Sequence, residues 1–381
     1  MVIAHSIEQW LPLTQNWVFN QLHYINSIQF IVLTYDVENL DLFPFPNIYQ
    51  ADPYSRFFFK AGRKLGIERQ ILPPIYNVGI RTQQATICHS HFGNRGWYDL
   101  ILTTKHKLKH IVTFYGFDVN MLPVKHPVWK KRYQELFARA DLFLCEGPFM
   151  AKNLIHLGCP NAKVEVQRLG IEVDEIPYLP RTLDNTQELR ILIAGTFREK
   201  KGIPYALEAI GILKDQFPGL TATVIGDSTK EKRSKREKQK IHEVIQQYSL
   251  QSAVRFMGFQ PHSALMAEAY KHHIFLSPSV TASDGDTEGG APVTIIEMLA
   301  SGMPVVSTQH CDIPEIIGHK NSGLLAEERN VEELTEHLKW LIENPSQWSE
   351  MTRKGREHVE KNFNVHVQAN KLKNIYYQIG T

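Results

Sequence analysis

Short apolar runs alternate with longer amphipathic runs along almost the whole chain. The short runs have the length and the Ile, Val, Leu and Phe content of buried strands, while the longer ones repeat apolar residues at helical spacing. Regular strand–helix alternation is typical of a parallel sheet covered by helices on both faces, which predicts an α/β fold. Strands are expected at Ser27–Tyr35, Thr86–His89, His110–Phe114, Asp141–Cys145, Lys163–Arg168, Leu189–Ala194, Thr221–Ile225, Ala253–Phe256, Ile274–Ser277 and Val305–Ser307, and helices at Pro127–Ala138 and Pro148–Leu157.

The alternation breaks once, in an acidic stretch that contains Pro177 and Pro180. Such a stretch has no sustained apolar period and is typical of a linker. A chain of 381 residues is also long enough for two domains, at about 100–200 residues each. We therefore predict two doubly wound, Rossmann-like domains over residues 1–172 and 189–360, a linker over residues 173–188, and a C-terminal helix over residues 361–381.

Composition excludes several classes of protein. Hydrophobic residues make up 43% and charged residues 22%, which is the balance of a globular protein and not of a disordered or fibrous one. Lys and Arg (42) nearly equal Asp and Glu (40), so a dedicated nucleic-acid binder is not expected. The four cysteines lie far apart with no CxxC pair. With no leader pattern and no run of about 18 apolar residues, we expect a cytoplasmic protein.

One strongly basic run, KEKRSKREKQK at Lys230–Lys240, stands out. A solvated helix face is the favoured interpretation, and binding to anionic lipid headgroups is the alternative. The sequence shows no evident amphipathic membrane anchor.

The most informative segment runs from Ile274 to Thr308. An apolar strand is followed by a polar loop, then by a helix expected to begin at Pro292 and to end before Gly302, and then by another strand. The loop therefore lies at the carboxyl end of a parallel strand, where open α/β sheets bind ligands.

Three features of this loop favour a diphosphate-containing ligand. Small residues allow backbone N–H groups to approach a ligand closely. The helix start at Pro292, Val293 and Thr294 presents free N–H donors and a partial positive charge. Glu288 and Glu297 flank that positive end, and carboxylates accept hydrogen bonds from sugar hydroxyls. The small residues are Gly289, Gly290 and Ala291.

These motifs resemble the donor loop of family-4 retaining glycosyltransferases of the GT-B fold, in the colanic-acid or exopolysaccharide branch. Further matches follow in order along the chain. They are HSHFG at His89, TFYGFDV at Thr113, CEGPFMAKNLIHLGCPNAKVEVQRLGIE at Cys145, ILIAGTFREKKGIPYALEAI at Ile191, VIGD at Val224, VRFMGF at Val254, SPS at Ser277, DIPEII at Asp312 and NSGLL at Asn321.

The resemblance implies two Rossmann-like domains that face an interdomain cleft, with the acceptor bound by the first and the donor by the second. The C-terminal helix would cross back to the first domain. The implied reaction moves a hexosyl group from a nucleoside-diphosphate sugar to a hydroxyl of a glycan or lipid-linked saccharide, with retention, in cell-surface polysaccharide biosynthesis. It leaves open a peripheral location at the cytoplasmic membrane face.

The resemblance also assigns residues. Glu288 would contact the transferred sugar, although one extra residue separates it from Glu297, which would hold the ribose. Thr196 stands where the family has an arginine, so Arg198 is the candidate to join Lys201 on the diphosphate; a solvent-facing loop charge is the alternative. The catalytic set is Glu288, Lys201, Arg198, His91 and Tyr115. Donor contacts also include Gly289, Gly290, Ala291, Pro292, Val293, Thr294, Gly195, Thr196, Gly226 and Asp227, and the acceptor side comprises Thr14, Gln15, Asn16, Trp17, Gly116 and Asp118.

No cofactor and no metal ion are expected. Asp284-Gly285-Asp286 has the form of a metal-binding DxD triplet from a different glycosyltransferase fold, but cations and a helix start already serve the diphosphate here. Paired histidines such as His89 and His91 lack a complete set of ligands. Two rival functions stay open. One is an epimerase or hydrolase that acts on the sugar nucleotide. The other is a catalytically silent binding protein, suggested by Thr196 in place of the family's arginine and Tyr115 in place of its histidine.

Overall fold

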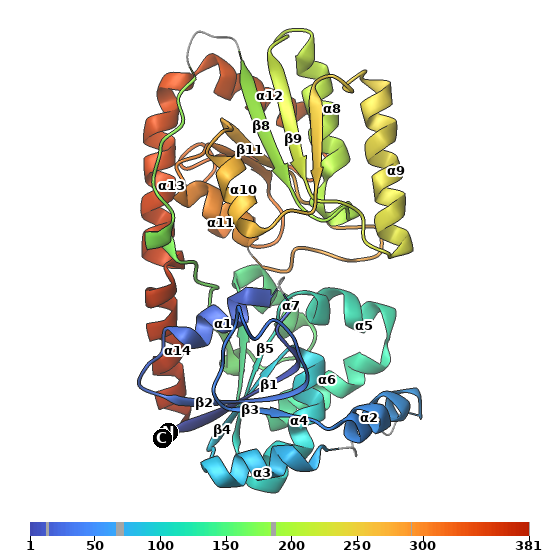
Figure 1. Ribbon diagram of the computed structural model, residues 1–381, viewed down its shortest axis with the longest axis vertical. Coiled ribbons are helices and arrows are strands. Elements are labelled where there is room, and N and C mark those ends of the chain that lie inside the picture. The colour runs from blue at the N-terminus through green and yellow to red at the C-terminus, as the bar shows by residue number, and fades with distance from the viewer. Residues whose placement is uncertain (13–14, 66–71, 184–187, 291, 381) are drawn as a thin grey trace. The chain divides into compact units, whose positions relative to one another are not determined.

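Two parallel sheets organise the computed structural model, which describes residues 1–12, 15–65, 72–183, 188–290 and 292–380. Each sheet belongs to its own unit (Figure 1). Unit 1 comprises Met1–Ile171 together with Val365–Thr381, and unit 2 comprises Glu172–Asn364. The last helix, α14 (Val365–Gly380), therefore packs with the N-terminal part of the chain.

The sheet of unit 1 has the strand order β3-β2-β1-β4-β5-β6-β7, and all its pairs are parallel. Its strands are β1 (Val2–Trp10), β2 (Gln29–Val37), β3 (Ile48–Gln50), β4 (Ile87–His91), β5 (Lys109–Thr113), β6 (Leu142–Cys145) and β7 (Val164–Val166). Its helices are α1 (Asn16–His23), α2 (Pro53–Leu65), α3 (Pro74–Gln83), α4 (Gly93–His106), α5 (Leu122–Lys125), α6 (Val128–Arg139), α7 (Pro148–His156) and α14, with a π-helical turn at Phe117–Met121 and a 3-10 turn at Asn161–Lys163.

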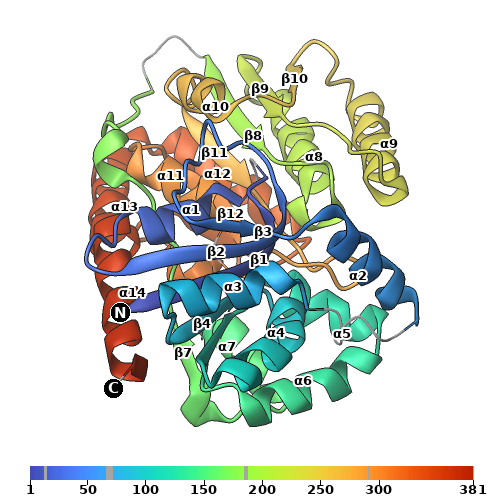
Figure 2. The same ribbon diagram turned by 60° about the horizontal axis from the view of Figure 1, so that its bottom comes forward.

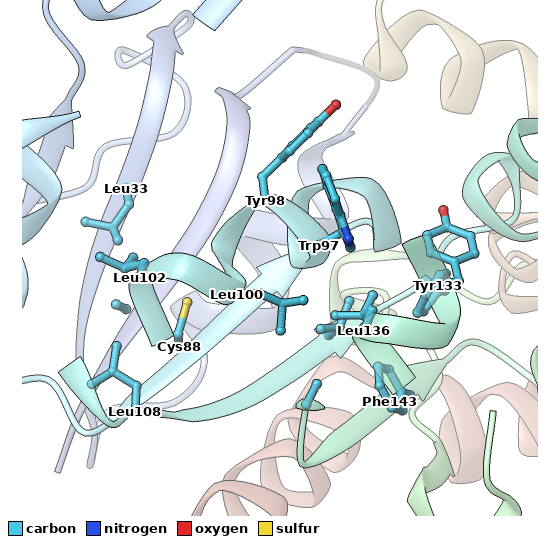
Figure 3. Packing of buried hydrophobic residues seen from close by; sticks show 14 of the residues in the cluster. Leu33, Cys88, Trp97, Tyr98, Leu100, Leu102, Leu108, Tyr133, Leu136 and Phe143 are labelled. Atoms are coloured by element: carbon cyan, nitrogen blue, oxygen red, sulfur yellow. The ribbon is translucent and has the colours of Figure 1, made fainter. Parts of the chain in front are cut away.

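Helices cover both faces of this sheet, which produces two apolar clusters. One cluster packs α3, α4, α6 and α7 against the strands, and the other packs α1 and α14 against the opposite face. Figure 3 shows part of the first cluster, where Leu100 of α4 lies toward Leu136 of α6, and Leu102 of the same helix lies toward Leu33 of β2 and Cys88 of β4. Strands buried on both faces explain why the sequence shows continuous apolar runs and not alternation.

The sheet of unit 2 has the order β10-β9-β8-β11-β12-β13 and is also entirely parallel. The strands are β8 (Leu189–Ala194), β9 (Leu220–Ile225), β10 (Val254–Gly258), β11 (Ile274–Ser277), β12 (Val305–Thr308) and β13 (Leu324–Ala326). The helices are α8 (Ile203–Lys214), α9 (Lys232–Gln247), α10 (His262–Ala269), α11 (Val293–Ala300), α12 (Val331–Glu343) and α13 (Trp348–Phe363), with 3-10 turns at Val173–Glu175, Glu199–Lys201, Ile313–Glu315 and Pro345–Gln347.

The predicted α/β fold is confirmed, and every predicted strand is present with ends that shift by a few residues. The sequence missed β1, β3 and β13. Residues 173–183, which were expected in a linker, belong to unit 2, where the buried Arg181 guanidinium donates to the backbone oxygens of Ser301 and Ala269. No helix within the described residues is long and apolar enough to cross a bilayer.

Candidate functional site

The polar loops of unit 2 meet where the strand order reverses. β8 and β11 are neighbours in the sheet, and the chain leaves them toward opposite sides of that sheet. The loop after β8 leads to Lys201, and the loop after β11 leads to Glu288 and then to α11, whose N-cap residue is Pro292. Such a switch point leaves room for a ligand at the carboxyl edge of the strands. The first N–H groups of α11 have no acceptor within the helix.

Lys201 and Glu288 form an ion pair at this point. The Lys201 Nζ lies 2.8 Å from Oε1 and 3.0 Å from Oε2 of Glu288, and the Ser279 hydroxyl donates to Oε1 at 2.9 Å. Burial alone would raise the pKa of Glu288, but the charges of Lys201 and Lys200 outweigh it and lower that pKa to about 2. Two of the predicted catalytic residues therefore lie in contact, and the Glu288 carboxylate is ionised.

Two glycines permit this close arrangement. Gly202, which follows Lys201, has φ +62, and a Cβ there would lie 1.8 Å from the carbonyl oxygen of Pro278. A Cβ on Gly226 would lie 2.0 Å from the carbonyl oxygen of Gly195. Both positions therefore need glycine, because any side chain would push apart the loops that follow β8, β9 and β11.

His310 supports the Glu288 loop and was missed by the sequence analysis. The backbone N–H of Glu288 donates to His310 Nε2 at 3.1 Å, so Nδ1 carries the proton and donates to Glu328 Oε1 at 2.6 Å. His310 is only 1% exposed. A carboxylate that orients an imidazole, which in turn holds a loop backbone, fixes the direction of the Glu288 side chain. The segment QHCD that follows β12 gave no pattern that would reveal this.

Glu297 lies on α11 and has a partner that the sequence did not indicate. His262 Nε2, at the start of α10, lies 2.8 Å from Glu297 Oε1. That hydrogen bond, followed by the negative charge of Glu297, raises the pKa of His262. Glu297 is 7% exposed, whereas the His262 side chain is largely exposed.

Arg198 lies in a different ionic network from Lys201. It pairs with Glu231 at 2.6 Å and with Asp286 at 3.6 Å. Asp286 also receives Lys200 at 3.2 Å and Arg233 at 3.1 Å. The network lines a cavity of about 410 Å³ between the loop at Asp284–Asp286 and α9. The aspartates of the DxD triplet are therefore engaged by protein cations, and Arg198 is held with them.

The other predicted donor residues occupy the same edge of the sheet. Asp227 accepts from Lys238 Nζ at 2.7 Å, and this contact lowers the pKa of Asp227. Thr196, Val293 and Thr294 are half-buried, while Gly289 and Gly290 are buried. Ala291 lies outside the described residues.

In unit 1, the predicted residues His91 and Tyr115 belong to a buried chain of hydrogen bonds. The Tyr115 hydroxyl lies 2.7 Å from His91 Nδ1, and His91 Nε2 lies 3.0 Å from Nδ1 of His5. Burial lowers the pKa of His91 to about 3, so its ring is neutral. Both ring nitrogens have protein partners, and the side chain is fully buried. His91 is therefore placed to orient Tyr115.

Asp118 fixes the loop that carries Tyr115. Its carboxylate accepts from the backbone N–H of Gly93 at 2.7 Å and of Tyr115 at 3.0 Å. Burial raises the pKa of Asp118 to about 6, although these hydrogen bonds oppose the shift. Gly116, in the same loop, has φ +103.

Trp17, another predicted acceptor-side residue, also reaches this cluster. Its ring lies 4.2 Å from the Tyr115 ring, between centroids. Gln15 is half-buried at the start of α1. Thr14 and the side chain of Asn16 lie outside the described residues.

Three histidines, His5, His89 and His91, form the one group of metal-type side chains that comes together within the described residues. The ring of His91 is nearly parallel to those of His89 and His5, at 20° and 29°. Both nitrogens of His89 are engaged, at 2.7 Å by Tyr376 and at 2.6 Å by Thr113. Stacked rings direct their lone pairs side by side, so this arrangement fits a hydrogen-bond network better than a metal centre.

Comparison with known proteins supplies the family context. A family model described as Glycosyltransferase Family 4 matches residues 38–175, and one described as Glycosyl transferases group 1 matches residues 178–358. The amylovoran biosynthesis glycosyltransferase AmsK of Erwinia amylovora is 34% identical over 312 residues, which cover 81% of this chain and 74% of that protein. The putative colanic acid biosynthesis glycosyltransferase WcaL of Escherichia coli K12 is 32% identical over 293 residues, covering 74% and 68%.

Solved structures resemble the whole chain in fold. Sucrose-phosphate synthase from Thermosynechococcus elongatus has a TM-score of 0.77 at 16% identity and covers 100% of this chain and 99% of its own. Anabaena HepE in complex with UDP has a TM-score of 0.78 at 13% identity and covers 99% and 100%. At these identities the likeness shows the fold alone, which is the two-domain GT-B fold.

Proposed function

Because this chain belongs to the family-4 glycosyltransferases, we propose that it transfers a hexosyl group from a nucleoside-diphosphate sugar to a hydroxyl of a glycan or lipid-linked saccharide, with retention at the anomeric carbon. That the chain is a glycosyltransferase follows from its family. The names of AmsK and WcaL support a place in exopolysaccharide biosynthesis. The HepE complexes with UDP, and with UDP and glucose, support a sugar nucleotide as donor.

The observation that carries the proposal is the ion pair of Lys201 with Glu288 in the loop that leads into α11, with Glu297 further along, on that helix. Lys201 and the first N–H groups of α11 are the donors that a diphosphate would bind. When the diphosphate takes part of the Lys201 interaction, Glu288 gains free acceptor capacity for the hydroxyls of the sugar. Glu297 keeps a second carboxylate oxygen for the ribose.

Catalysis in this proposal is electrostatic. Charge grows on the departing diphosphate as the glycosidic bond breaks, and preorganised donors stabilise that charge. The departing phosphate takes the proton of the acceptor hydroxyl, so no side chain has to act as the base. Tyr115 would line the acceptor site, and His91 would position it. Because Arg233 and Lys200 already neutralise the DxD aspartates, we propose that the reaction needs no metal ion and no cofactor, and that chelators leave activity unchanged.

A thermal-shift screen with UDP-, GDP- and ADP-sugars tests the donor site, since a ligand that binds the native state raises the midpoint of unfolding. We expect Glu297→Ala to abolish the shift given by the best donor and to raise the donor KM. Glu332→Ala, an exposed carboxylate of α12, is the matched control and should behave as wild type. Equal donor binding by Glu297→Ala and wild type would refute the ribose role. Anomeric analysis of the product by NMR tests retention, and transfer to an acceptor excludes an epimerase and a silent binding protein.

A further inference from the structure

Helix α2 of unit 1 packs one aromatic side chain against its own unit and exposes three others to solvent. Phe59 points inward and is 3% exposed; its ring stacks on that of Tyr35, with centroids 4.5 Å apart, and meets the ring of Tyr98 edge to face at 5.2 Å. The neighbouring aromatic residues point outward: Tyr54 is 78% exposed, Phe57 66% and Phe58 56%. Both views place α2 at the outer edge of unit 1 (Figures 1 and 2). This outward set of three rings is called the aromatic face below.

Charge indicates what covers the aromatic face. The sequence of α2 contains four basic residues and no acidic one; among those whose side chains are described, Lys60 is exposed and Arg56 pairs with Asp36. Unit 1 as a whole contains 20 Lys and Arg against 12 Asp and Glu, a net charge of +8, whereas unit 2 contains 22 against 28, a net charge of −6. The near-neutral total conceals this asymmetry. Exposed aromatic rings on a basic helix are suited to the boundary between lipid headgroups and acyl chains, with cations near the lipid phosphates.

We propose that the aromatic face of α2 docks unit 1 on an anionic phospholipid bilayer. Tyr54, Phe57 and Phe58 would enter the headgroup region, and the exposed Lys60 would remain at the level of the phosphates. No amphipathic anchor was evident from the sequence, because Phe57, Phe58 and Phe59 form a continuous apolar run. In the structure Phe59 is buried and its two neighbours are exposed.

A second exposed patch lies on α5 and α6 of the same unit. Val124 of α5 and Val128 at the start of α6 are 62% and 52% exposed, and exposed Lys125, Lys130 and Lys131 surround them. A chain of rings joins α2 to α6, because Phe59 packs on Tyr98, and Tyr98 lies 5.8 Å from Trp129 of α6. The same helix layer therefore presents aromatic, aliphatic and cationic side chains.

Vesicle flotation tests the docking without relying on catalysis. The full-length chain is mixed with vesicles of phosphatidylglycerol and phosphatidylcholine, and separately with pure phosphatidylcholine. We expect binding to the anionic vesicles that weakens with salt. F57S/F58S should bind at least about tenfold more weakly, because two large apolar side chains no longer leave water. K60E should weaken binding by a smaller factor. Phe259→Ser, an exposed phenylalanine of unit 2, is the matched control and should bind as wild type.

Three outcomes overturn the proposal. Equal flotation of F57S/F58S and wild type would show that α2 does not contact lipid. Loss of flotation in K232E/K235E, which changes exposed cations of α9, with F57S/F58S unaffected, would place lipid binding on the basic run of unit 2. If light scattering shows that wild type self-associates and F57S/F58S does not, and neither binds vesicles, a second copy of the chain covers the aromatic face. Donor-induced thermal shifts stay intact in F57S/F58S if the proposed function holds, so the two proposals fail separately.

Discussion

The candidate polar sites of the two units use opposite electrostatic designs. In unit 2, Glu288 faces Lys201 and Asp286 faces Arg233, so the site consists of ionised pairs. In unit 1, His5, His91 and Tyr115 form a neutral chain with full burial of both histidines. An ion pair can exchange one partner for a charged ligand, whereas a buried neutral network has no favourable way to receive a charge. The comparison therefore assigns ligand binding to the first design and loop positioning to the second.

The largest effect is expected from Lys201→Ala. Loss of this ammonium removes charge that would stabilise the departing diphosphate, so kcat should fall by about 10²–10³-fold. Lys200→Ala is the matched control, because Lys200 is the next residue but binds Asp286 and the carbonyl of Thr287. Its kcat should fall by less than about tenfold. Steady-state kinetics with a saturating donor checks both.

Lys201→Ala also leaves Glu288 buried without its cation, which can unfold the loop. The double variant Lys201→Ala/Glu288→Gln removes that unpaired charge and keeps the measurement interpretable. If Lys200→Ala and Lys201→Ala are both folded and lose kcat to a similar degree, the Lys201–Glu288 pair does not differ in role from the Lys200–Asp286 pair.

A second prediction concerns acid. Burial, the largest cause in each case, lowers the pKa of five histidines of unit 1, of which His106 is half-buried. The other four are fully buried: His5 and His89, whose pKa values fall well below the usual range, His91, whose pKa falls to about 3, and His110, whose pKa falls to about 4. Below about pH 6.5 the unfolded chain binds protons that the folded unit excludes, so the free energy of unfolding falls as the pH drops. Each of the four fully buried histidines contributes up to about 1.4 kcal/mol per pH unit between its unfolded and its folded pKa. Within the described residues, unit 2 has two histidines shifted this way, His272 and His319.

The acid response should separate the two units. The Glu288 pair, whose carboxylate has a pKa of about 2, contributes its stability above about pH 4.5 and loses it only as the pH falls further toward 2. Hydrogen exchange at pH 7 and pH 5, corrected for intrinsic rates, should therefore show β1 and β4 opening before β8 and β11. His91→Gln should reduce the slope, while His126→Gln, an exposed control, should not. Earlier opening of unit 2 would contradict the comparison.

The same contrast explains what the sequence could and could not predict. β8 and β11 were predicted to the residue, because buried parallel strands read as unbroken apolar runs. β1 was missed although it lies inside the sheet of unit 1. His5 and Ser6 interrupt its apolar pattern, and both are buried by hydrogen bonds that come from distant parts of the chain. Local pattern cannot anticipate a polar residue whose partner lies 86 positions away.

The candidate site divides in the same way. The loop at Glu288 and the helix start at Pro292 were predicted, because their geometry is local. The partners His310 and His262 were not predicted, because each lies in a separate segment of the chain. His310 follows β12 and contacts the backbone of Glu288, and His262 begins α10 and contacts Glu297 on α11. The resemblance implied that Arg198 joins Lys201 on the diphosphate, because Thr196 stands where the family has an arginine. In the structure Arg198 pairs with Glu231 and Asp286, since the chain is extended at Arg198 and a 3-10 turn follows at Glu199–Lys201; its role on the diphosphate stays a prediction.

The smallest effect is expected at His262. It tests whether a hydrogen-bond partner orients the Glu297 carboxylate of unit 2, in addition to the attraction between opposite charges. His262 is largely exposed, so its contact with Glu297 contributes about 0.2–1 kcal/mol. His262→Ala should raise the donor KM by about two- to fivefold with kcat unchanged, because Glu297 loses its orientation toward the ribose.

The pH profile gives the sign of this effect. Because the pKa of His262 is raised, its pairing is complete at low pH and is lost as the pH rises through that pKa, opposite to the histidines of unit 1. The wild-type donor KM should therefore rise toward alkaline pH, and His262→Ala should flatten the profile. His262→Gln keeps an N–H donor that does not titrate, so it should combine a near-wild-type KM with a flat profile. A profile that stays steep in His262→Gln would assign the titration to another group and leave Glu297 oriented by α11 alone.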